Sequence, residues 1–357
     1  MNSSSSFALT VKNMITVMMI ATLGAGLAWG MNRGVQKIPI RQYFANSQTN
    51  AVWDWANINN HSAQDLQDKA VFLSLHQINK VFVDISGYAA ISQNPDPITK
   101  ADEEAKLTKS IEAYVGAMNR RGIKVFASAG DTDWSKPENQ AIPLAIEQFA
   151  HTYNSNHPVK LAGVEFDIEA YNQANFAAAS FTEKELVLDE YLDMVDRLAT
   201  AQSTYIKDTG DKNMELGFSI PYWFDNENQN IKSVSWHDKT GPVLFHILDR
   251  LNVLPHSNVV VMAYRNSASG NDGMVYHSRI EVEYAASKAQ NVDILIGLEV
   301  NNVEPVKITF YGQSYTEISS QVKVLDTEFK DKKVFKGIAI NDLSGYEAIG
   351  TSKATTL

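Results

Sequence analysis

The sequence predicts an α/β protein whose body is a single (β/α)8 TIM barrel, preceded by an N-terminal hydrophobic segment. From Ala51 onward, eight short runs of β-branched and aromatic residues alternate with longer amphipathic stretches. Buried parallel strands read as near-continuous apolar runs, and each return to a parallel neighbour needs a crossover helix. An open doubly wound sheet would carry a glycine-rich phosphate turn after its first strand, but residues 57–61 (NINNH) contain no glycine. The alternation therefore favours the closed barrel.

The expected elements follow one another as strand and then helix along the whole body. The expected strands cover residues 51–56, 80–85, 124–129, 162–167, 215–220, 258–263, 293–298 and 335–340. Helices are expected where apolar residues recur three and four positions apart, as Tyr191, Met194 and Leu198 do. These helices cover residues 63–77, 100–121, 139–156, 182–209, 241–251, 273–290 and 315–332, with a short final helix at 346–350.

The first 48 residues are not expected to belong to the barrel. Residues 13–31 form an uncharged, largely apolar run after a Ser-rich start that contains one lysine. That layout is typical of a secretory signal with cleavage after Ala28, yet about 20 apolar residues also suffice to span a bilayer. We expect residues 1–31 to be a signal peptide or a membrane anchor, residues 32–48 a polar tether and residues 49–357 the barrel domain. The folded part is then secreted or periplasmic, and it is held at the inner membrane if residues 13–31 are retained.

The amino-acid composition argues against several classes of function. The chain has a net charge of −10 and its 31 Lys and Arg residues are scattered, which argues against a nucleic-acid binder because phosphate neutralisation needs clustered cations. Cysteine is absent, so thiolate nucleophiles and Cys-ligated metals are excluded. The eight histidines show neither H-x-H nor H-E-x-x-H spacing. We expect neither a metal nor another cofactor.

A barrel of this type places its active site at the carboxyl ends of its strands. Those ends carry acids beside aromatic residues, which is the combination that a sugar site needs: flat apolar faces for the ring and carboxyl groups for the glycosidic oxygen. The residues expected to bind substrate are Trp53, Asp84, Ser128, Asp131, Trp134, Tyr222, Trp223, Arg265 and Asn341. The expected partner is an oligosaccharide or a polysaccharide.

The fourth expected strand carries three acids at alternating positions, Glu165, Asp167 and Glu169. Alternate residues of a strand point to the same side, so these three side chains are expected to project into the barrel. Like charges so close together raise the pKa of at least one carboxyl group, and a general acid near neutral pH requires a raised pKa. A structural interpretation, in which some of these acids pair with Lys or Arg at a solvated strand end, stays open.

Three short motifs, in the same order along the chain, resemble glycoside hydrolase family 18, the chitinase group. Residues 162–169 (AGVEFDIE) fit the frame D-G-x-D-x-D-x-E of that family's fourth strand, residues 128–131 (SAGD) fit S-x-G-G in part, and residues 262–264 (MAY) fit M-x-Y. The resemblance implies the same barrel, with Glu169 as the proton donor to the leaving glycosidic oxygen. It also implies that Asp167 orients the substrate's N-acetyl group, whose carbonyl oxygen attacks the anomeric carbon, and that Tyr264 hydrogen-bonds that group.

The chain departs from the family pattern at four positions. Ala162 and Glu165 stand where the family has aspartates, the second of them at the place of a buried one. Arg265 follows the tyrosine where an aspartate is common, and the last strand shows Asn341 in the region where the family's floor tryptophan is expected. The missing tryptophan weighs against chitin itself as the substrate.

Glu299 opens a second mechanism, because it ends the seventh expected strand as Glu169 ends the fourth. Retaining barrel glycosidases place their acid/base and their nucleophile at these two strand ends. Two carboxyl groups about 5–5.5 Å apart would support a covalent glycosyl-enzyme intermediate, whereas a wider gap would not. A structural acid that accepts hydrogen bonds from loop amides is the competing interpretation for Glu299.

The sequence thus predicts an exported or membrane-tethered glycoside hydrolase acting on an amino-sugar-containing polysaccharide, with general-acid catalysis by Glu169. One alternative is a catalytically inactive carbohydrate-binding barrel, a chitinase-like lectin, which the altered positions 162, 165 and 265 favour. Another is a structural surface protein that keeps only the fold. An open cleft over Glu169 would favour the enzyme, whereas a salt bridge of Arg265 that fills the cleft would favour the lectin.

Overall fold

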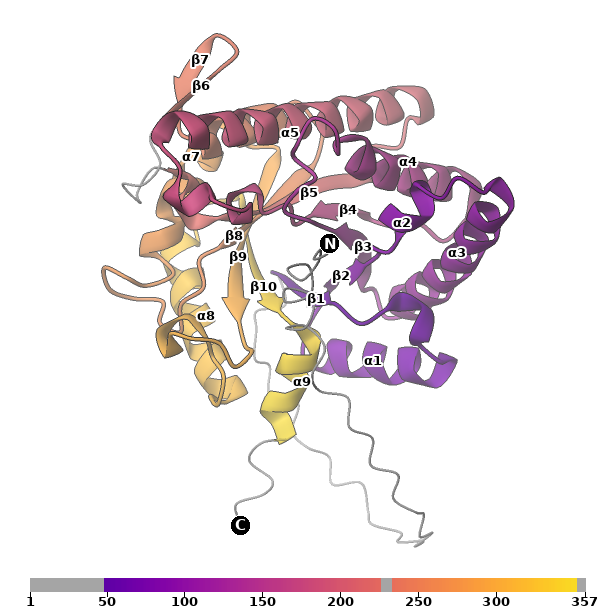
Figure 1. Ribbon diagram of the computed structural model, residues 1–357. Coiled ribbons are helices and arrows are strands. Elements are labelled where there is room, and N and C mark those ends of the chain that lie inside the picture. The colour runs from indigo at the N-terminus through magenta and orange to yellow at the C-terminus, as the bar shows by residue number, and fades with distance from the viewer. Residues whose placement is uncertain (1–47, 226–232, 352–357) are drawn as a thin grey trace, which may run out of the picture. The chain divides into compact units, whose positions relative to one another are not determined.

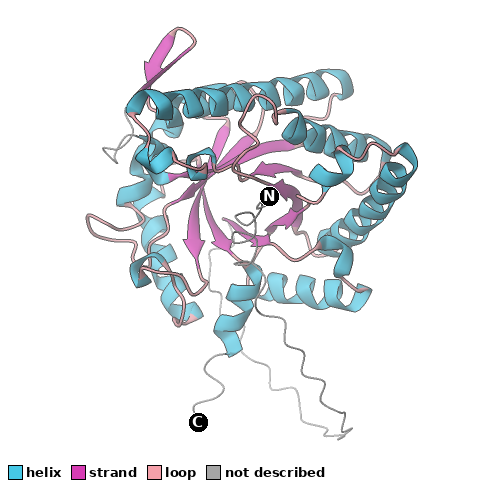
Figure 2. Cartoon of the chain, viewed as in Figure 1, coloured by secondary structure: helices cyan, strands magenta, loops and turns pink. Residues whose placement is uncertain are grey.

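The computed structural model describes residues 48–225 and 233–351. Eight parallel strands close into a barrel that helices surround (Figures 1 and 2). The barrel strands are β1 (Thr49–Asp54), β2 (Lys80–Asp84), β3 (Lys124–Ala129), β4 (Gly163–Phe166), β5 (Glu215–Pro221), β8 (Ser257–Met262), β9 (Val292–Glu299) and β10 (Phe335–Asn341). Their order around the barrel follows their order in the chain. The predicted barrel and its eight strands are confirmed.

The helices follow the strands as the sequence predicts. They are α1 (Ala63–Leu75), α2 (Tyr88–Ser92), α3 (Pro97–Asn119), α4 (Ala141–Asn156), α5 (Phe181–Thr209), α6 (Val243–Leu251), α7 (Arg279–Lys288), α8 (Tyr315–Phe329) and α9 (Leu343–Thr351). Three of them begin with a capping box, in which Ser62, Ser180 or Ser314 accepts a hydrogen bond from the third helical residue and the acid of that residue accepts one in return. Such boxes satisfy amide groups that the first turn leaves unpaired.

The helix α3 begins three residues earlier than predicted, at Pro97 rather than at position 100. The side chain of Asp96 accepts hydrogen bonds from the backbone N–H groups of Ile98 and Thr99. Proline has no N–H that the first turn would leave unpaired, so this position suits it. The cap and the proline together fix the start of the helix.

Other differences lie in short elements. The helix expected over residues 273–290 covers only 279–288, and the one expected over 346–350 begins at Leu343. The helix α2 and an antiparallel hairpin of β6 (Val234–Trp236) and β7 (Lys239–Gly241) were not predicted. Elements this short hold too few residues for a periodic pattern to be recognised.

The N-terminal segment expected to be a signal peptide or anchor, residues 1–31, lies outside the described residues, and so does the tether up to residue 47. Both assignments remain predictions. Among residues 48–225 and 233–351, no helix has the length and apolar character needed to cross a membrane.

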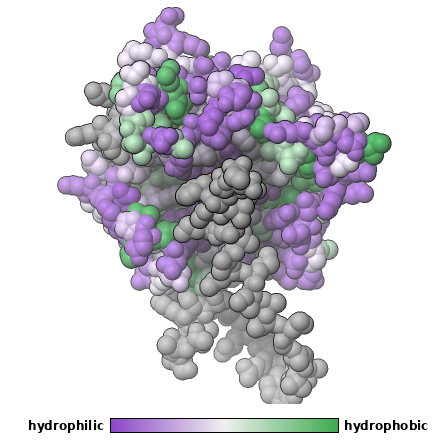
Figure 3. All heavy atoms as spheres, in the orientation of Figure 1, coloured by the Kyte–Doolittle hydropathy of each residue, from purple (hydrophilic) through white to green (hydrophobic). Residues whose placement is uncertain are grey.

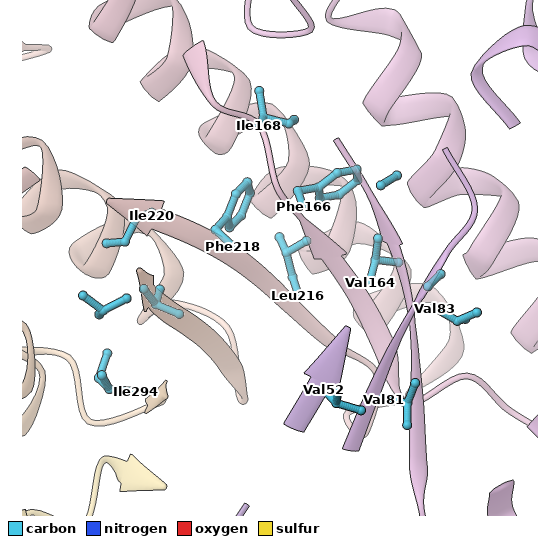
Figure 4. Packing of buried hydrophobic residues seen from close by; sticks show 14 of the residues in the cluster. Val52, Val81, Val83, Val164, Phe166, Ile168, Leu216, Phe218, Ile220 and Ile294 are labelled. Atoms are coloured by element: carbon cyan, nitrogen blue, oxygen red, sulfur yellow. The ribbon is translucent and has the colours of Figure 1, made fainter. Parts of the chain in front are cut away.

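Two apolar layers flank the barrel strands. The larger one packs strands against helices and includes Val52, Val164, Phe166 and Phe218 (Figure 4). A second, separate cluster fills the barrel interior and comprises Ala51, Trp53, Phe82, Phe126, Val260, Leu295 and Ala339. Successive strand residues face opposite sides. Glu165, which lies between Val164 and Phe166, therefore points into the barrel.

The face of the molecule in Figure 3 is predominantly hydrophilic, with apolar residues scattered over it. The large hydrophobic side chains exposed in the described part of the chain are Trp55, Leu75, Ile98, Leu186, Val253, Tyr276, Val306, Tyr311 and Val324. Scattered single residues of this kind are ordinary. Trp55 and Tyr311 each line a cavity, and both cavities adjoin the carboxyl ends of barrel strands.

Candidate functional site

The acid column, which we define as Glu165, Asp167 and Glu169, occupies the barrel interior and the carboxyl end of β4. Glycines make room for it. A Cβ atom at Gly217 of β5 would lie 1.9 Å from Glu165 Oε2, and one at Gly130 after β3 would lie 1.9 Å from the backbone oxygen of Asp167. Neither position accepts a larger residue without displacing the column.

Glu165 is completely buried. Its Oε1 accepts a hydrogen bond of 3.1 Å from Ser219 Oγ, and its Oε2 has no hydrogen-bond partner among the described residues. Burial raises the pKa of Glu165 well above its ordinary value; Lys80 and Ser219 oppose this rise, and the charge of Asp167 adds to it. Burial in the barrel interior therefore favours the protonated form of the Glu165 carboxyl group.

Asp167 lies one step nearer the mouth of the barrel. Its Oδ1 atom is buried and accepts no hydrogen bond within the described residues. Burial, followed by the negative charge of Glu169, raises the pKa of Asp167 from 3.8 to about 7. The column thus keeps a proton up to neutral pH, which is the state that general-acid chemistry needs.

Glu169 ends the column and accepts two hydrogen bonds. Tyr171 donates its hydroxyl to Oε1 at 2.5 Å, and Asn172 donates its side-chain amide to Oε2 at 2.8 Å. Both donors belong to the short 3-10 helix Ala170–Asn172, which turns the chain back towards the carboxyl group directly after it. The carboxyl group is consequently held in one orientation at the edge of the barrel mouth.

Tyr264 follows β8 and faces the acid column. Burial, followed by the charges of Asp167, Glu299 and Glu169, raises the pKa of Tyr264 well above its ordinary value. Gly297 of β9 makes room for the ring, because a Cβ atom there would lie 2.9 Å from Tyr264 Cε1. The hydroxyl group therefore stays protonated and can donate a hydrogen bond beside the carboxyl groups.

A cavity of about 340 Å³ opens above the column, and we call it the acid cavity. It is lined by Trp55, Asp84, Ser86, Gly130, Asp131, Thr132, Asp167 and Glu169. Four of these residues were predicted as site residues: Asp84, Asp131, Asp167 and Glu169. The turns after β2 and β3 hold two of them in place, because Asp84 Oδ1 accepts from the N–H of Ser86 at 2.8 Å and Asp131 Oδ1 from that of Asp133 at 2.8 Å.

The tryptophan at the mouth is Trp55, whereas the predicted Trp53 lies beneath it. Trp53 is 1% exposed, and its ring stacks under that of Trp55 with centroids 6.3 Å apart and an interplanar angle of 10°. Trp55 is 38% exposed, and its Nε1 donates to Asn341 Oδ1 at 2.9 Å. Both rings share one side of the chain, as period-two alternation requires. The residue nearer the carboxyl end is the one that lines the cavity.

Glu299 is buried at the end of β9 and bonds with loop amides. Its Oε1 accepts from the backbone N–H groups of Val300 and Asn301 at 2.8 and 2.7 Å, and its Oε2 accepts from Asn341 Nδ2 at 2.8 Å. Burial raises the pKa of Glu299, and these hydrogen bonds oppose the rise. Asn341 therefore links the Glu299 carboxyl group to the indole of Trp55.

Arg265 does not pair with the acid column. Its Nε donates to Asp272 Oδ1 at 2.7 Å, its Nη1 to the backbone oxygen of Tyr264 at 2.7 Å and its Nη2 to the Tyr222 hydroxyl at 3.4 Å. Lys307 and His277 also donate to Asp272. The guanidinium group thus braces the loop after β8 and lies outside the set of residues that line the acid cavity.

The remaining predicted binding residues are not among those that line the acid cavity. Ser128 and Trp134 are buried, the latter in the layer between strands and helices. Trp223 is half-buried and meets the Tyr171 ring edge-on, with centroids 5.0 Å apart. Trp223 consequently supports Tyr171, which in turn holds Glu169.

No group of three or more His, Asp or Glu side chains is arranged to hold a metal ion within residues 48–225 and 233–351. The acid column differs from a metal site in its contacts, since Glu165 bonds with Ser219 and Glu169 bonds with Tyr171 and Asn172.

Comparisons with known proteins identify the fold. No family model and no curated protein sequence matches the chain. Among solved structures, the family 18 chitinase from Cycas revoluta in complex with (GlcNAc)3 has 11% sequence identity and a TM-score of 0.50, with coverage of 84% of this chain and 97% of the chitinase. The AHE enzyme from Alicyclobacillus herbarius has 8% identity and a TM-score of 0.50, covering 84% and 88%.

A xylanase and α-amylase inhibitor protein in complex with trehalose has 13% identity and a TM-score of 0.44, covering 85% of this chain and 96% of the inhibitor. At these identities the likeness concerns the fold alone. The distant resemblance to the family 18 barrel that the motifs predict is confirmed at that level.

Proposed function

We propose that the protein is a glycoside hydrolase that acts on an amino-sugar-containing polysaccharide, with Glu169 as the general acid. The observation that carries the proposal is the acid cavity, which the exposed ring of Trp55 lines together with Asp167 and Glu169. Glycoside cleavage needs a flat aromatic face and a carboxyl group at the glycosidic oxygen, and Asp167 next to Glu169 keeps a proton up to about neutral pH. The chitinase with a similar barrel binds (GlcNAc)3, which supports an amino sugar as the substrate class.

The proposed reaction uses the substrate's own acetamide group. Glu169 gives its proton to the glycosidic oxygen while the acetamide carbonyl oxygen attacks the anomeric carbon, and the bond from that carbon to the leaving oxygen breaks. Asp167 orients the acetamide N–H, and Tyr264 donates a hydrogen bond to the group. Water then attacks the anomeric carbon and gives a proton to Glu169, while the bond from that carbon to the acetamide oxygen breaks and the acetamide group is restored. This route is an exception to the usual pair of carboxyl groups.

The contacts of Glu299 favour this route over a covalent glycosyl-enzyme. Two backbone N–H groups and Asn341 donate to its carboxyl oxygens. These three hydrogen bonds hold the carboxyl group against the loop after β9, as expected of a structural acid. The ion pair of Arg265 with Asp272 also favours an enzyme, since it leaves the acid cavity to the substrate.

A carbohydrate-binding barrel without turnover is the second candidate. The hydrogen bonds from Tyr171 and Asn172 favour it, because both oxygens of Glu169 act as acceptors in this geometry. In this state the carboxyl group acts as an acceptor only, whereas a general acid must carry a proton. Binding of saccharides without cleavage by the intact chain is the result that this candidate predicts.

The test compares wild type, Glu169→Gln and the surface control Glu103→Gln on labelled amino-sugar oligosaccharides. Loss of a general acid lowers the rate by about 10²–10⁴-fold, so E169Q should lose that much hydrolysis while its affinity, measured by calorimetry, stays within about twofold. E103Q should behave as wild type, because Glu103 is an exposed residue of α3. Full hydrolysis by E169Q would disprove the role of Glu169.

The proposal includes a location outside the cytoplasm, either secreted or periplasmic, with residues 13–31 as a cleaved signal or a retained anchor. Its support is the uncharged run in the sequence. The mass of the mature chain recovered from membrane and soluble fractions separates the cases. A chain that begins after Ala28 indicates cleavage, a full-length chain in the membrane fraction indicates an anchor, and a full-length chain in the cytosol contradicts the proposal.

A further inference from the structure

A second cavity, of about 460 Å³, lies beyond the carboxyl ends of β9 and β10, and we call it the Tyr311 cavity. It is lined by Val300, Asn301, Asn302, Tyr311, Gly312, Ser344, Gly345, Ala348 and Ile349. All barrel strands are parallel, so their carboxyl ends meet at one end of the barrel. The Tyr311 cavity and the acid cavity therefore share the same end of the molecule.

The chemistry of the lining differs between the two cavities. None of the nine side chains around the Tyr311 cavity is charged, whereas four of the eight residues around the acid cavity are acids. An aromatic ring beside amide and hydroxyl groups suits a neutral, hydroxyl-rich ligand, and the volume lies within the range of ligand sites, about 300–1,000 Å³. The Tyr311 cavity is therefore suited to binding such a ligand, and no acid or base lines it.

Tyr311 is 56% exposed and yet stands on a firmly held loop. Its backbone N–H donates to Thr309 Oγ1 at 3.0 Å, and that hydroxyl donates to the backbone oxygen of Asn301 at 2.6 Å. The preceding residue, Phe310, is fully buried and donates its N–H to the backbone oxygen of Glu299 at 2.8 Å. A ring presented in this way binds a ligand with little loss of conformational entropy, because the loop is ordered beforehand.

A short chain of contacts joins the two cavities. Asn301, in the wall of the Tyr311 cavity, donates its side-chain amide to the backbone oxygen of Asn341 at 3.2 Å. The side chain of Asn341 accepts from Trp55, which lines the acid cavity. Gly345 permits this arrangement, because a Cβ atom there would lie 2.4 Å from Asn301 Oδ1. Asn341 thus connects Trp55 of the acid cavity with Asn301 of the Tyr311 cavity.

We propose that the Tyr311 cavity is a second saccharide subsite, which holds a neutral sugar unit of the same polymer whose glycosidic bond lies in the acid cavity. The inference rests on the proposed function and adds the kind of substrate: a chain long enough to pass over Trp55 and reach Tyr311. Short oligosaccharides occupy the acid cavity alone. The protein therefore prefers long chains, and Tyr311 is a specificity-determining residue rather than a catalytic one.

The test measures binding of short and long amino-sugar oligosaccharides to the full chain in the E169Q background, where turnover does not interfere. Tyr311→Ala should weaken binding of a long oligosaccharide roughly 3- to 10-fold, which is the loss expected for one aromatic contact, and leave a dimer within about twofold. Tyr311→Phe keeps the ring and should retain the affinity for long chains. Tyr276→Ala, at an exposed tyrosine outside both cavities, is the matched control.

In the active chain, Tyr311→Ala should raise KM for long substrates only and leave kcat unchanged. Equal losses on short and long substrates, or no loss on either, would overturn the subsite. A chain that ends at Thr351 tests another occupant, because α9 lines the cavity and six residues follow it. If long chains bind Tyr311 only after this truncation, the cavity belongs to the protein's own C-terminal segment and the proposal is wrong.

The outcomes also separate this inference from the proposed function. If wild type cleaves short oligosaccharides and Tyr311→Ala changes nothing, the subsite alone fails. If the intact chain binds no saccharide of any length, the proposed function fails and the subsite fails with it.

Discussion

The two ends of the barrel interior treat carboxyl groups in opposite ways. At the amino ends of the strands, Glu215 of β5 lies 3.3 Å from the amines of both Lys80 and Lys124. Towards the carboxyl ends, Glu165 and Asp167 form no ion pair within the described part of the chain and rely on neutral partners or none. Burial alone would raise the pKa of Glu215, but the two lysines outweigh it and lower that pKa, whereas the pKa values of Glu165 and Asp167 are raised.

Within one barrel, buried carboxyl groups thus serve either stability or chemistry, depending on their partners. A buried carboxylate with paired cations is a structural element, and its loss leaves the cations uncompensated. A buried carboxyl group without such a partner has a raised pKa. Its ionisation lowers the stability of the folded state, but the raised pKa suits it to proton transfer. We call the amino ends of the strands the lower end of the barrel and the carboxyl ends the upper end. Mutations at the lower end should therefore change mainly the stability, and mutations at the upper end should change the activity and its dependence on pH.

Removal of the Glu215 charge should have the largest effect on stability. Glu215→Gln leaves the Lys80 amine, 6% exposed, without its carboxylate, so we expect the free energy of unfolding to fall by about 3–5 kcal/mol at pH 7. Because the pKa of Glu215 is lowered in the folded state, its contribution is present above pH 4.5 and disappears on acidification. The difference between wild type and E215Q in urea unfolding curves should therefore shrink steadily as the pH falls below 4.5.

A double variant sharpens this prediction. Lys80→Met with Glu215→Leu removes both buried charges together, and such replacements are often neutral or stabilising. We expect it to recover most of the stability that E215Q loses. If the double variant is as unstable as the single one, the loss comes from packing and not from the unpaired lysine.

Asp167→Asn should change stability with the opposite dependence on pH. The pKa of Asp167 is raised from 3.8 to about 7, so the folded wild type holds its proton more tightly than the unfolded chain does. Wild-type stability therefore falls between about pH 4 and pH 7, and D167N lacks that fall. Allowing for its partial exposure, the variant should be more stable by about 1–3 kcal/mol at pH 8, equal below pH 4, and impaired in hydrolysis.

Melting temperatures of wild type and D167N, measured across pH 4–8, test this prediction. The E169Q variant serves as the control for loss of activity. A gap that widens as the pH rises agrees with an Asp167 carboxyl group that is costly to ionise. A gap that narrows as the pH rises would mean that Asp167 is a stabilising carboxylate, as Glu215 is, and would remove it from the chemistry.

The upper end could be read from the sequence because its pattern is local. Period-two alternation on one strand places Glu165, Asp167 and Glu169 together, and the rule for strand ends places Asp84 and Asp131 beside them. The choice of Trp53 over Trp55 failed to find the exposed ring, because alternation fixes the side on which a ring lies but not its depth in the barrel. The turn at residues 170–172, whose side chains hold Glu169, was not predicted either, because a three-residue turn has no periodic sequence pattern.

The lower end could not be read in this way. Lys80 and Glu215 are 135 positions apart, and they meet only because the barrel closes. The position of Tyr311 depends likewise on a loop whose fold is set by contacts with β9 and by the buried Phe310. Such contacts have no sequence signature at either partner.

The smallest expected effect concerns the other lysine at the lower end. Lys124 lies as close to Glu215 as Lys80 does, yet its side chain is 61% exposed. Water and dissolved ions screen such a pair, so Lys124→Gln should lower the free energy of unfolding by at most about 1 kcal/mol, and by less at high salt. The effect of E215Q should persist in the same salt, because its main partner is buried. An equal salt dependence of both variants would mean that solvent reaches Lys80 as well, and the lower end would then be no more protected from water than the upper one.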